Sequence, residues 1–135
     1  MAGLLVNLGE VRMLSLLTND GQALENNVLR LYQNDKTPAE TDTAGDYTQA
    51  TFTGYVAITL TATDWTITSG APSDATALEK TFSSTADQAL QNIYGYYLVT
   101  AVGGELVAAE RFTGAPFAIQ FNGDQIKVTT KITQD

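Results

Sequence analysis

The stretch Gln91–Phe112, QNIYGYYLVTAVGGELVAAERF, carries the strongest structural signal in the chain. Its first part, Ile93–Val99, is aromatic, β-branched or aliphatic except for one glycine, which is typical of a strand and too short for a helix. Both faces of this strand are apolar, so we expect it to lie centrally, covered on both sides or at an interface. Gly103-Gly104 then supplies the positive φ that a tight hairpin needs. The stretch predicts an all-β protein.

Further strands are predicted on both sides of this hairpin by alternation of apolar and polar residues. Asn122-Gly123 is the strongest short hairpin signal and is expected to join the last two strands. About eight strands in 135 residues favour a single domain, residues 1–135, built as a two-sheet antiparallel β-sandwich of jelly-roll-like type. The additional strands are expected at Leu24–Gln33, Phe52–Thr61, Trp65–Thr68, Thr76–Ser83, Phe117–Phe121 and Gln125–Thr133.

The N-terminal region, about residues 1–21, is predicted to form an arm followed by one short helix over residues 8–18. Asn7 and Glu10 have the spacing of a capping box, and Gly21 suits the end of the helix. The apolar stripe of this helix is wider than a soluble helix needs. Two interpretations stay open: the helix packs on the sandwich and closes one end, or it docks on a partner protein. The stripe comprises Leu8, Val11, Met13, Leu14, Leu16 and Leu17.

Composition excludes several classes of function. The chain has no histidine and no cysteine, which removes the commonest general base, thiolate chemistry and the commonest metal ligand. Its net charge of −8 disfavours nucleic acid and anionic membranes as partners, because both repel an acidic surface. The first ten residues lack the basic segment of a signal peptide, so folding in a cytoplasm is expected.

No catalytic, cofactor or metal site is predicted. Glu105 and Glu110 could share acid–base work, but residues five apart on a strand point to opposite faces. The loop Asp35–Asp46 is rich in carboxylates, which could bind calcium, yet its spacing does not match an EF-hand. We expect this loop to be solvated and metal-free. Arg111 and Glu110 are expected to form an edge salt bridge or an intersubunit contact.

The aromatic residues leave two interpretations open. The cluster Tyr94, Tyr96 and Tyr97 suits protein–protein contact, where tyrosine is enriched. The alternative is that most of the six tyrosines are half-buried in the sandwich. Trp65, the single tryptophan, is expected in the core, and its alternative role is a platform that stacks on a sugar.

An ordered series of short motifs runs through the chain. It comprises LRLYQNDKTP (29–38), ETD (40–42), F52 with GY (54–55), ITLT (58–61), WT (65–66), GAPS (70–73), NIYGYY (92–97), AERF (109–112) and NGD (122–124). In this order the motifs resemble those of small structural proteins of tailed bacteriophages, often encoded close to the major capsid protein. The resemblance covers about residues 4–133.

This resemblance implies a non-enzymatic capsid decoration or cement protein, made in the host bacterial cytoplasm and placed on the capsid surface of the virion. The implied partner is the major capsid protein, with the chain as a dimer or trimer at capsid symmetry axes. The alternative function is a tail or baseplate adhesin that binds host glycans, which an exposed Trp65 would favour. The residues predicted to lie at a protein interface are Leu4, Leu5, Leu14, Leu17, Tyr94, Tyr96 and Arg111.

Overall fold

The computed structural model describes residues 3–18 and 24–134. The prediction of a mostly β chain with one short N-terminal helix is confirmed. Two short 3-10 turns cover Ala44–Asp46 and Ala62–Asp64. The helix and strands are β1 (Leu4–Leu5), α1 (Asn7–Thr18), β2 (Asn27–Tyr32), β3 (Ile58–Leu60), β4 (Trp65–Thr68), β5 (Ser73–Ala77), β6 (Lys80–Ser83), β7 (Gln91–Ile93), β8 (Gly95–Thr100), β9 (Leu106–Arg111), β10 (Phe117–Ile119), β11 (Gln125–Val128) and β12 (Lys131–Gln134).

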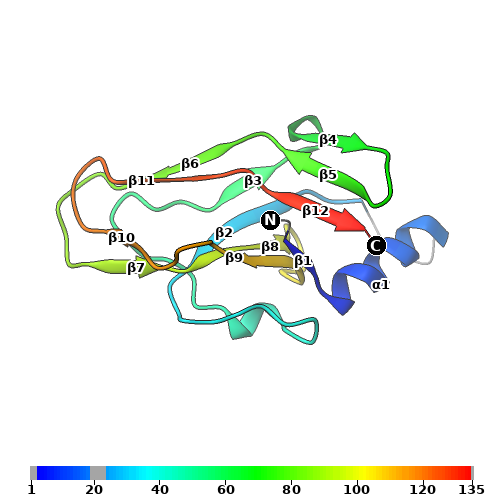
Figure 1. Ribbon diagram of the computed structural model, residues 1–135, viewed down its shortest axis with the longest axis horizontal. Coiled ribbons are helices and arrows are strands. Elements are labelled where there is room, and N and C mark those ends of the chain that lie inside the picture. The colour runs from blue at the N-terminus through cyan, green and yellow to red at the C-terminus, as the bar shows by residue number, and fades with distance from the viewer. Residues whose placement is uncertain (1–2, 19–23, 135) are drawn as a thin grey trace.

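The paired strands are antiparallel throughout. The largest sheet has the order β1-β9-β8-β2-β3, and a three-stranded sheet has the order β12-β5-β4. Two strand pairs, β10-β7 and β11-β6, extend the molecule away from the N-terminal helix. In Figure 1 the strands β4, β5, β6, β11 and β12 run along the upper side, and β2, β7, β8, β9 and β10 run along the lower side. Helix α1 lies at one end.

Strand β8 is the centre of the molecule, as its sequence predicts, and all six of its residues are buried. It pairs with β2 on one side and with β9 on the other. One of its faces, with Tyr96 and Leu98, belongs to the main core cluster, which also includes residues of β5, β6, β10 and β11. The other face, with Tyr97 and Val99, belongs to a second cluster that includes Val6 and Tyr47. The expectation of cover on both sides is therefore confirmed.

Several strand boundaries differ from the prediction. The segment predicted as one strand at Phe52–Thr61 is reduced to β3, because Gly54 adopts a φ of 91° and the N–H of Tyr55 closes a turn on the carbonyl of Phe52. Val56 consequently points to solvent and is 71% exposed. The predicted strand Thr76–Ser83 is interrupted at exposed Leu78, whose N–H bonds the Asp64 carbonyl outside the sheet.

The hairpin predicted at Asn122-Gly123 is wrong. A tight turn does form there, with Gly123 at φ 93° and the Asp124 carboxylate accepting the N–H groups of Gln120 and Phe121. The strands on its two sides pair with different partners, β10 with β7 and β11 with β6. Asn-Gly specifies a reversal of the chain, but the partners available elsewhere decide which strands pair.

Of the two interpretations of the tyrosine residues, placement in the core describes most of them. Tyr32, Tyr47, Tyr96 and Tyr97 are buried. The rings of Tyr47 and Tyr97 stack with centroids 5.1 Å apart, and Tyr32 meets Tyr47 edge-on at 5.0 Å. Tyr47 comes from the long loop between β2 and β3, so this aromatic cluster fastens the loop to the second face of the large sheet.

The loop predicted to be solvated is organised around one buried carboxylate, that of Asp42. This carboxylate accepts the Tyr47 hydroxyl at 2.7 Å and the Ala39 N–H at 2.9 Å, and it pairs with the Lys36 ammonium at 2.9 Å. Burial opposes ionisation, but these three donors outweigh it and hold the pKa of Asp42 below its usual value. Burial and the bond to Asp42 raise the pKa of the Tyr47 hydroxyl far above its usual value.

Candidate protein-docking groove

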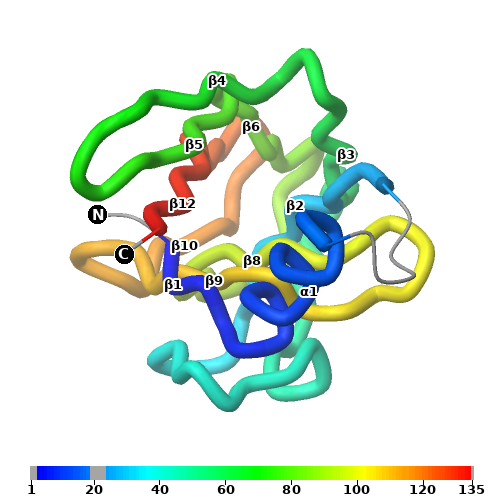
Figure 2. Tube along the Cα trace, turned by 90° about the vertical axis from the view of Figure 1, so that its right-hand side faces the viewer, coloured from blue at the N-terminus to red at the C-terminus, as the bar shows by residue number. Residues whose placement is uncertain are grey.

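An open groove lies between α1 and the ends of β1 and β12, with a volume of about 1010 Å³. It brings together four of the residues predicted for a protein interface: Leu4 and Leu5 from β1 with Leu14 and Leu17 from α1. Figure 2 looks onto this end of the molecule, with α1 in front of β8 and β9. We call this site the N-terminal groove. Its lining residues are Gly3, Leu4, Leu5, Glu10, Met13, Leu14, Leu16, Leu17, Glu40, Thr133 and Gln134.

The groove opens where the chain leaves β12 after Gly3 and pairs with β9 instead. The Gly3 N–H donates to the Lys131 carbonyl at 2.6 Å, in a single bridge between Gly3 and Ile132. The next residues, Leu4 and Leu5, pair instead with Ala109 and Ala108 of β9. Strand β12 continues along β5, so the two strands separate and leave an opening between them.

Helix α1 closes the other side of the groove and is held in place at its start. Val6 is fully buried, and its N–H donates to the Val107 carbonyl at 3.1 Å. The Asn7 N–H donates to the Glu40 carbonyl at 3.1 Å. At Gly9 the helix lies so close to β9 that a Cβ atom would be 2.5 Å from the Val107 carbonyl oxygen. This contact is made through a residue with no side chain, so it hides little of the apolar surface of the helix.

Two of the predicted interface leucines are consequently exposed. The side of α1 that faces the groove presents Leu14, 62% exposed, and Leu17, 83% exposed, beside Met13. Val11, on another side of the helix, is 60% exposed. A contiguous apolar surface of this kind is unusual for a monomeric soluble protein and is typical of a site for a partner.

The flank of α1 away from the groove is held by charges. The guanidinium of Arg12 lies 3.5 Å from the Glu25 carboxylate and 3.9 Å from that of Glu105. Glu25 also accepts the Val102 N–H at 3.5 Å from the turn between β8 and β9. These contacts set the orientation of the helix and leave its leucine side facing the opening.

The other predicted interface residues lie outside the N-terminal groove. Tyr96 is 2% exposed, and its hydroxyl donates to Glu110 Oε2 at 2.7 Å. Burial, and then this bond, raises the pKa of Tyr96 well above its usual value. Arg111 donates to Asp35 at 2.6 Å and to the Lys36 carbonyl at 3.1 Å, and its guanidinium lies 5.1 Å from the centre of the Tyr94 ring. The expected edge salt bridge between Arg111 and Glu110 is therefore wrong, and the alternative of an intersubunit contact stays a prediction.

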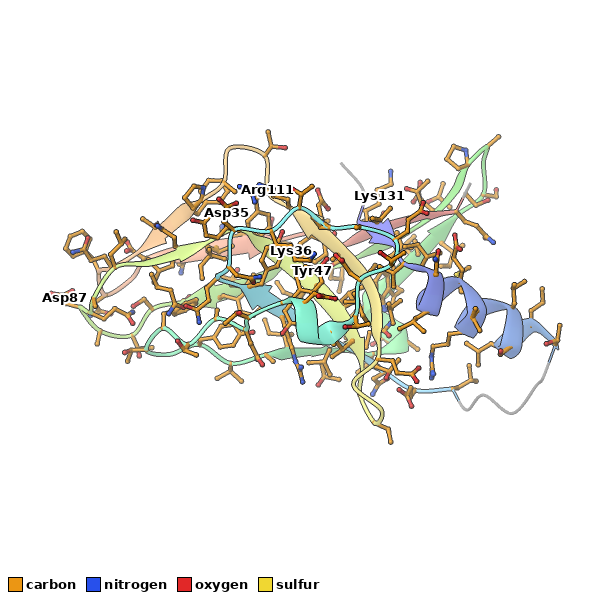
Figure 3. All side chains as sticks on the ribbon, turned by 90° about the horizontal axis from the view of Figure 1, so that it is seen from below. Asp35, Lys36, Tyr47, Asp87, Arg111 and Lys131 are labelled. Atoms are coloured by element: carbon orange, nitrogen blue, oxygen red, sulfur yellow. The ribbon has the colours of Figure 1, made fainter. Side chains whose placement is uncertain are left out.

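A smaller cavity of about 420 Å³ connects this region with Leu4, since Leu4, Glu110 and Arg111 all line it. Figure 3 shows Asp35, Lys36 and Arg111 gathered on one side of the molecule, with Asp87 at the end opposite α1. Asp35 and Arg111 already pair with each other, and Phe112 is among the other residues that line the cavity. The guanidinium of Arg111 is therefore already engaged by a carboxylate of the same chain.

The carboxylates of the acidic loop are directed to separate partners. Asp35 pairs with Arg111, Asp42 with Lys36, and Asp46 accepts the Thr43 N–H at 2.8 Å. Over residues 3–18 and 24–134, no group of three or more acidic side chains gathers where it could hold a metal ion. The same part of the chain contains no helix long and apolar enough to cross a membrane.

Sequence reasoning identified the leucines of the groove but missed its rim. Met13 and Leu16 were part of the predicted apolar stripe. Glu40 and Gln134 carried no signal, because each reaches the groove from a segment distant in sequence. Gln134 is placed by the pairing of β12 with β5, and Glu40 by a loop whose Glu40 carbonyl accepts the Asn7 N–H. Comparisons with known proteins add no relative: no protein-family model matches the chain, and no similar curated protein or solved structure was found.

Proposed function

We propose that this protein is a non-enzymatic structural protein that binds the major capsid protein lattice of a tailed bacteriophage and stabilises the head. The observation that carries the proposal is the convergence of Leu4, Leu5, Leu14 and Leu17 on one open groove. The resemblance of the motif series in the sequence supplies the identity of the partner. The location that follows is the capsid surface of the virion.

The exposed leucines can supply the energy of docking. Burying one leucine side chain fully is worth about 1.5–3 kcal/mol relative to leaving it in water. Leu14 and Leu17 are more than half exposed, so a partner that covers them gains most of this amount before the costs of association. A binding surface that forms only when capsid subunits assemble would make this binding shift the equilibrium toward the assembled state.

A rigid scaffold suits this role, and we infer a two-sheet sandwich. The main core cluster contains Leu31 and Leu98 from the large sheet together with Phe82 and Val128 from the pair β11-β6. Residues of both sides of the molecule in Figure 1 thus share one core. Jelly-roll connectivity stays a prediction.

The symmetry of a capsid shell is a reason to expect this protein to form oligomers. Copies of a decoration protein follow the symmetry of the lattice, which favours dimers or trimers at local axes. Tyr94 and Arg111 are half-buried in the single chain. The exposed part of each side chain would contact a neighbouring copy at such an axis. The net charge of −8 disfavours adhesion of the protein to packaged nucleic acid.

The adhesin alternative rests on Trp65, and the structure gives it limited support. Trp65 opens β4 and is partly buried against the main core cluster. A ring packed in this way has one side against the core instead of open to a ligand. The neighbouring Ile67 is 72% exposed, so β4 could still contact a partner through an apolar side chain.

Binding to capsids tests the proposal directly. Capsids assembled from the major capsid protein of the phage that encodes this chain are expected to bind it and to withstand higher temperatures with it than without it. The double variant Leu14→Gln/Leu17→Gln is expected to lose binding, because glutamine keeps helix propensity but removes the apolar surface. Co-sedimentation and thermal disruption of the capsids measure both effects.

A matched control replaces two exposed apolar residues outside the groove, Val56→Gln/Leu90→Gln, and should bind as the parent does. If the folded Leu14/Leu17 variant decorates capsids as well as the parent, the groove is not the docking surface. If the unaltered protein ignores capsids and binds host cells or glycans instead, the adhesin function replaces the one proposed.

A further inference from the structure

The N-terminal groove has a charge pattern in addition to its apolar floor. Of the residues that line it, the charged ones are Glu10 and Glu40, and both are exposed. Lys131 lies on β12 near the groove, but its ammonium is 3.3 Å from the Asp74 carboxylate and belongs to the sheet side. The groove therefore offers leucine and methionine side chains between two carboxylates that form no ion pair within residues 3–18 and 24–134.

The helical wall of the groove has the spacing that a second helix needs. Glu10, Leu14 and Leu17 follow one another at intervals of four and three residues along α1, and Met13 precedes Leu17 by one turn. Side chains at these intervals form a ridge on one side of a helix. An amphipathic helix placed along this ridge would insert its apolar residues between α1 and β1.

A second copy of this chain is a poor occupant. Pairing two grooves face to face would bring Glu10 and Glu40 of both copies into one interface, with no basic residue among the lining groups to compensate. Each copy also carries a net charge of −8. Like charges in an interface disfavour binding, whereas basic groups on a partner would be attracted by the same field.

We propose that the N-terminal groove binds an amphipathic helical segment of another protein, whose apolar face carries flanking lysine or arginine residues that pair with Glu10 and Glu40. The inference rests on the proposed function, since it describes the part of the partner that the groove contacts. Apolar contact with the leucines supplies affinity, and the two carboxylates select a basic segment over an acidic one.

Three matched peptides test the charge selection without a capsid. Each is an 18-residue amphipathic helix with the same leucine face, and its polar positions next to that face carry lysine, glutamine or glutamate. In fluorescence anisotropy at about 0.05 M salt, the lysine peptide is expected to bind most tightly, the glutamine peptide less tightly and the glutamate peptide least tightly. Binding of the lysine peptide should weaken as salt rises, because exposed charge pairs are screened.

Two double variants separate the groove from the overall charge. Glu10→Gln/Glu40→Gln is expected to lower the affinity for the lysine peptide at least about threefold, which is the effect of losing one or two exposed ion pairs. The control Glu79→Gln/Asp87→Asn removes two exposed carboxylates outside the groove, and asparagine keeps the acceptor for the Asn122 N–H. The control should bind as the parent does. Leu14→Gln/Leu17→Gln should lower the affinity for both the lysine and the glutamine peptide by more than about tenfold.

Several outcomes overturn the inference. Equal affinity for the lysine and glutamate peptides shows that the carboxylates select nothing. Equal weakening by both charge-removing variants shows a general attraction to an acidic protein. Concentration-dependent dimerisation that Leu14→Gln/Leu17→Gln abolishes identifies a second copy as the occupant. If capsid binding requires the leucines but survives Glu10→Gln/Glu40→Gln unchanged, the proposed function stands and only the basic partner segment is wrong.

Discussion

Strand β8 and helix α1 are both rich in apolar residues, yet they have opposite environments. Every residue of β8 is buried, whereas Gly9 is the one buried residue of α1. The strand has a sheet neighbour on each edge and a core cluster on each face. The helix touches β9 through Gly9 and lacks cover over Leu14 and Leu17.

The comparison separates apolar residues that fold the chain from apolar residues that remain available. Side chains in β8 exchange water for protein contacts when the chain folds, so they contribute to the free energy of unfolding. Leu17 is 83% exposed and keeps most of its surface in water. Its burial can therefore contribute to binding a partner.

Replacing one leucine in each region gives the largest contrast. Leu98→Ala should lower the free energy of unfolding by about 4 kcal/mol, because Leu98 is fully buried and its truncation leaves a cavity in the main core. Leu14→Ala should change it by less than about 0.5 kcal/mol, since an exposed position loses little packing. Urea denaturation of both variants measures the difference. Equal losses would mean that α1 belongs to the core.

Gly95, the first residue of β8, tests how tightly the centre is packed. A Cβ atom there would overlap the Glu110 carbonyl oxygen and lie 2.6 Å from Cε1 of the Tyr32 ring. Gly95→Ala should destabilise the protein by about 3 kcal/mol through this overpacking. Gly103→Ala is the control, because its nearest atom, the Thr100 hydroxyl oxygen, would lie 3.4 Å away. If Gly95→Ala unfolds at the same temperature as the parent protein, the close packing of Gly95 against Glu110 and Tyr32 is wrong.

The second core cluster, on the face of β8 that carries Tyr97, depends on Asp42. The Asp42 carboxylate accepts the hydroxyl of Tyr47, whose ring stacks on Tyr97. Asp42→Asn should cost about 2 kcal/mol near neutral pH, since it removes charge-assisted hydrogen bonds at a buried carboxylate. Because the folded state lowers the pKa of Asp42 below its usual 3.8, its contribution is present above that value and lost as pH falls through the folded pKa.

The measurement for Asp42 is urea denaturation of parent and variant across a pH series. The difference in stability should be constant near neutral pH and shrink below about pH 4. A difference that does not depend on pH would show that the ionised form makes no special contribution.

The sequence alone predicted the β class, the central position of β8 and the start of α1 to within one residue. The helix end predicted at Gly21 lies outside the described residues. These features depend on local properties, namely period-two alternation, a continuous run of β-forming residues and the signals at a helix start. Alternation along β2 places Leu29 and Tyr32 on opposite faces of the sheet, and the two residues belong to different core clusters. The sequence also marked Leu4, Leu5, Leu14 and Leu17 as interface residues.

The tertiary structure decided which strands pair and which apolar residues are covered. Asn122-Gly123 turns the chain, but pairing with β6 and β7 separates the strands on its two sides. The separation of β1 from β12 after Gly3 creates the groove, and long-range contacts bring Glu40 of a loop and Gln134 of β12 to it. Local residue patterns carry no record of such contacts, because each depends on the competition among all segments for partners.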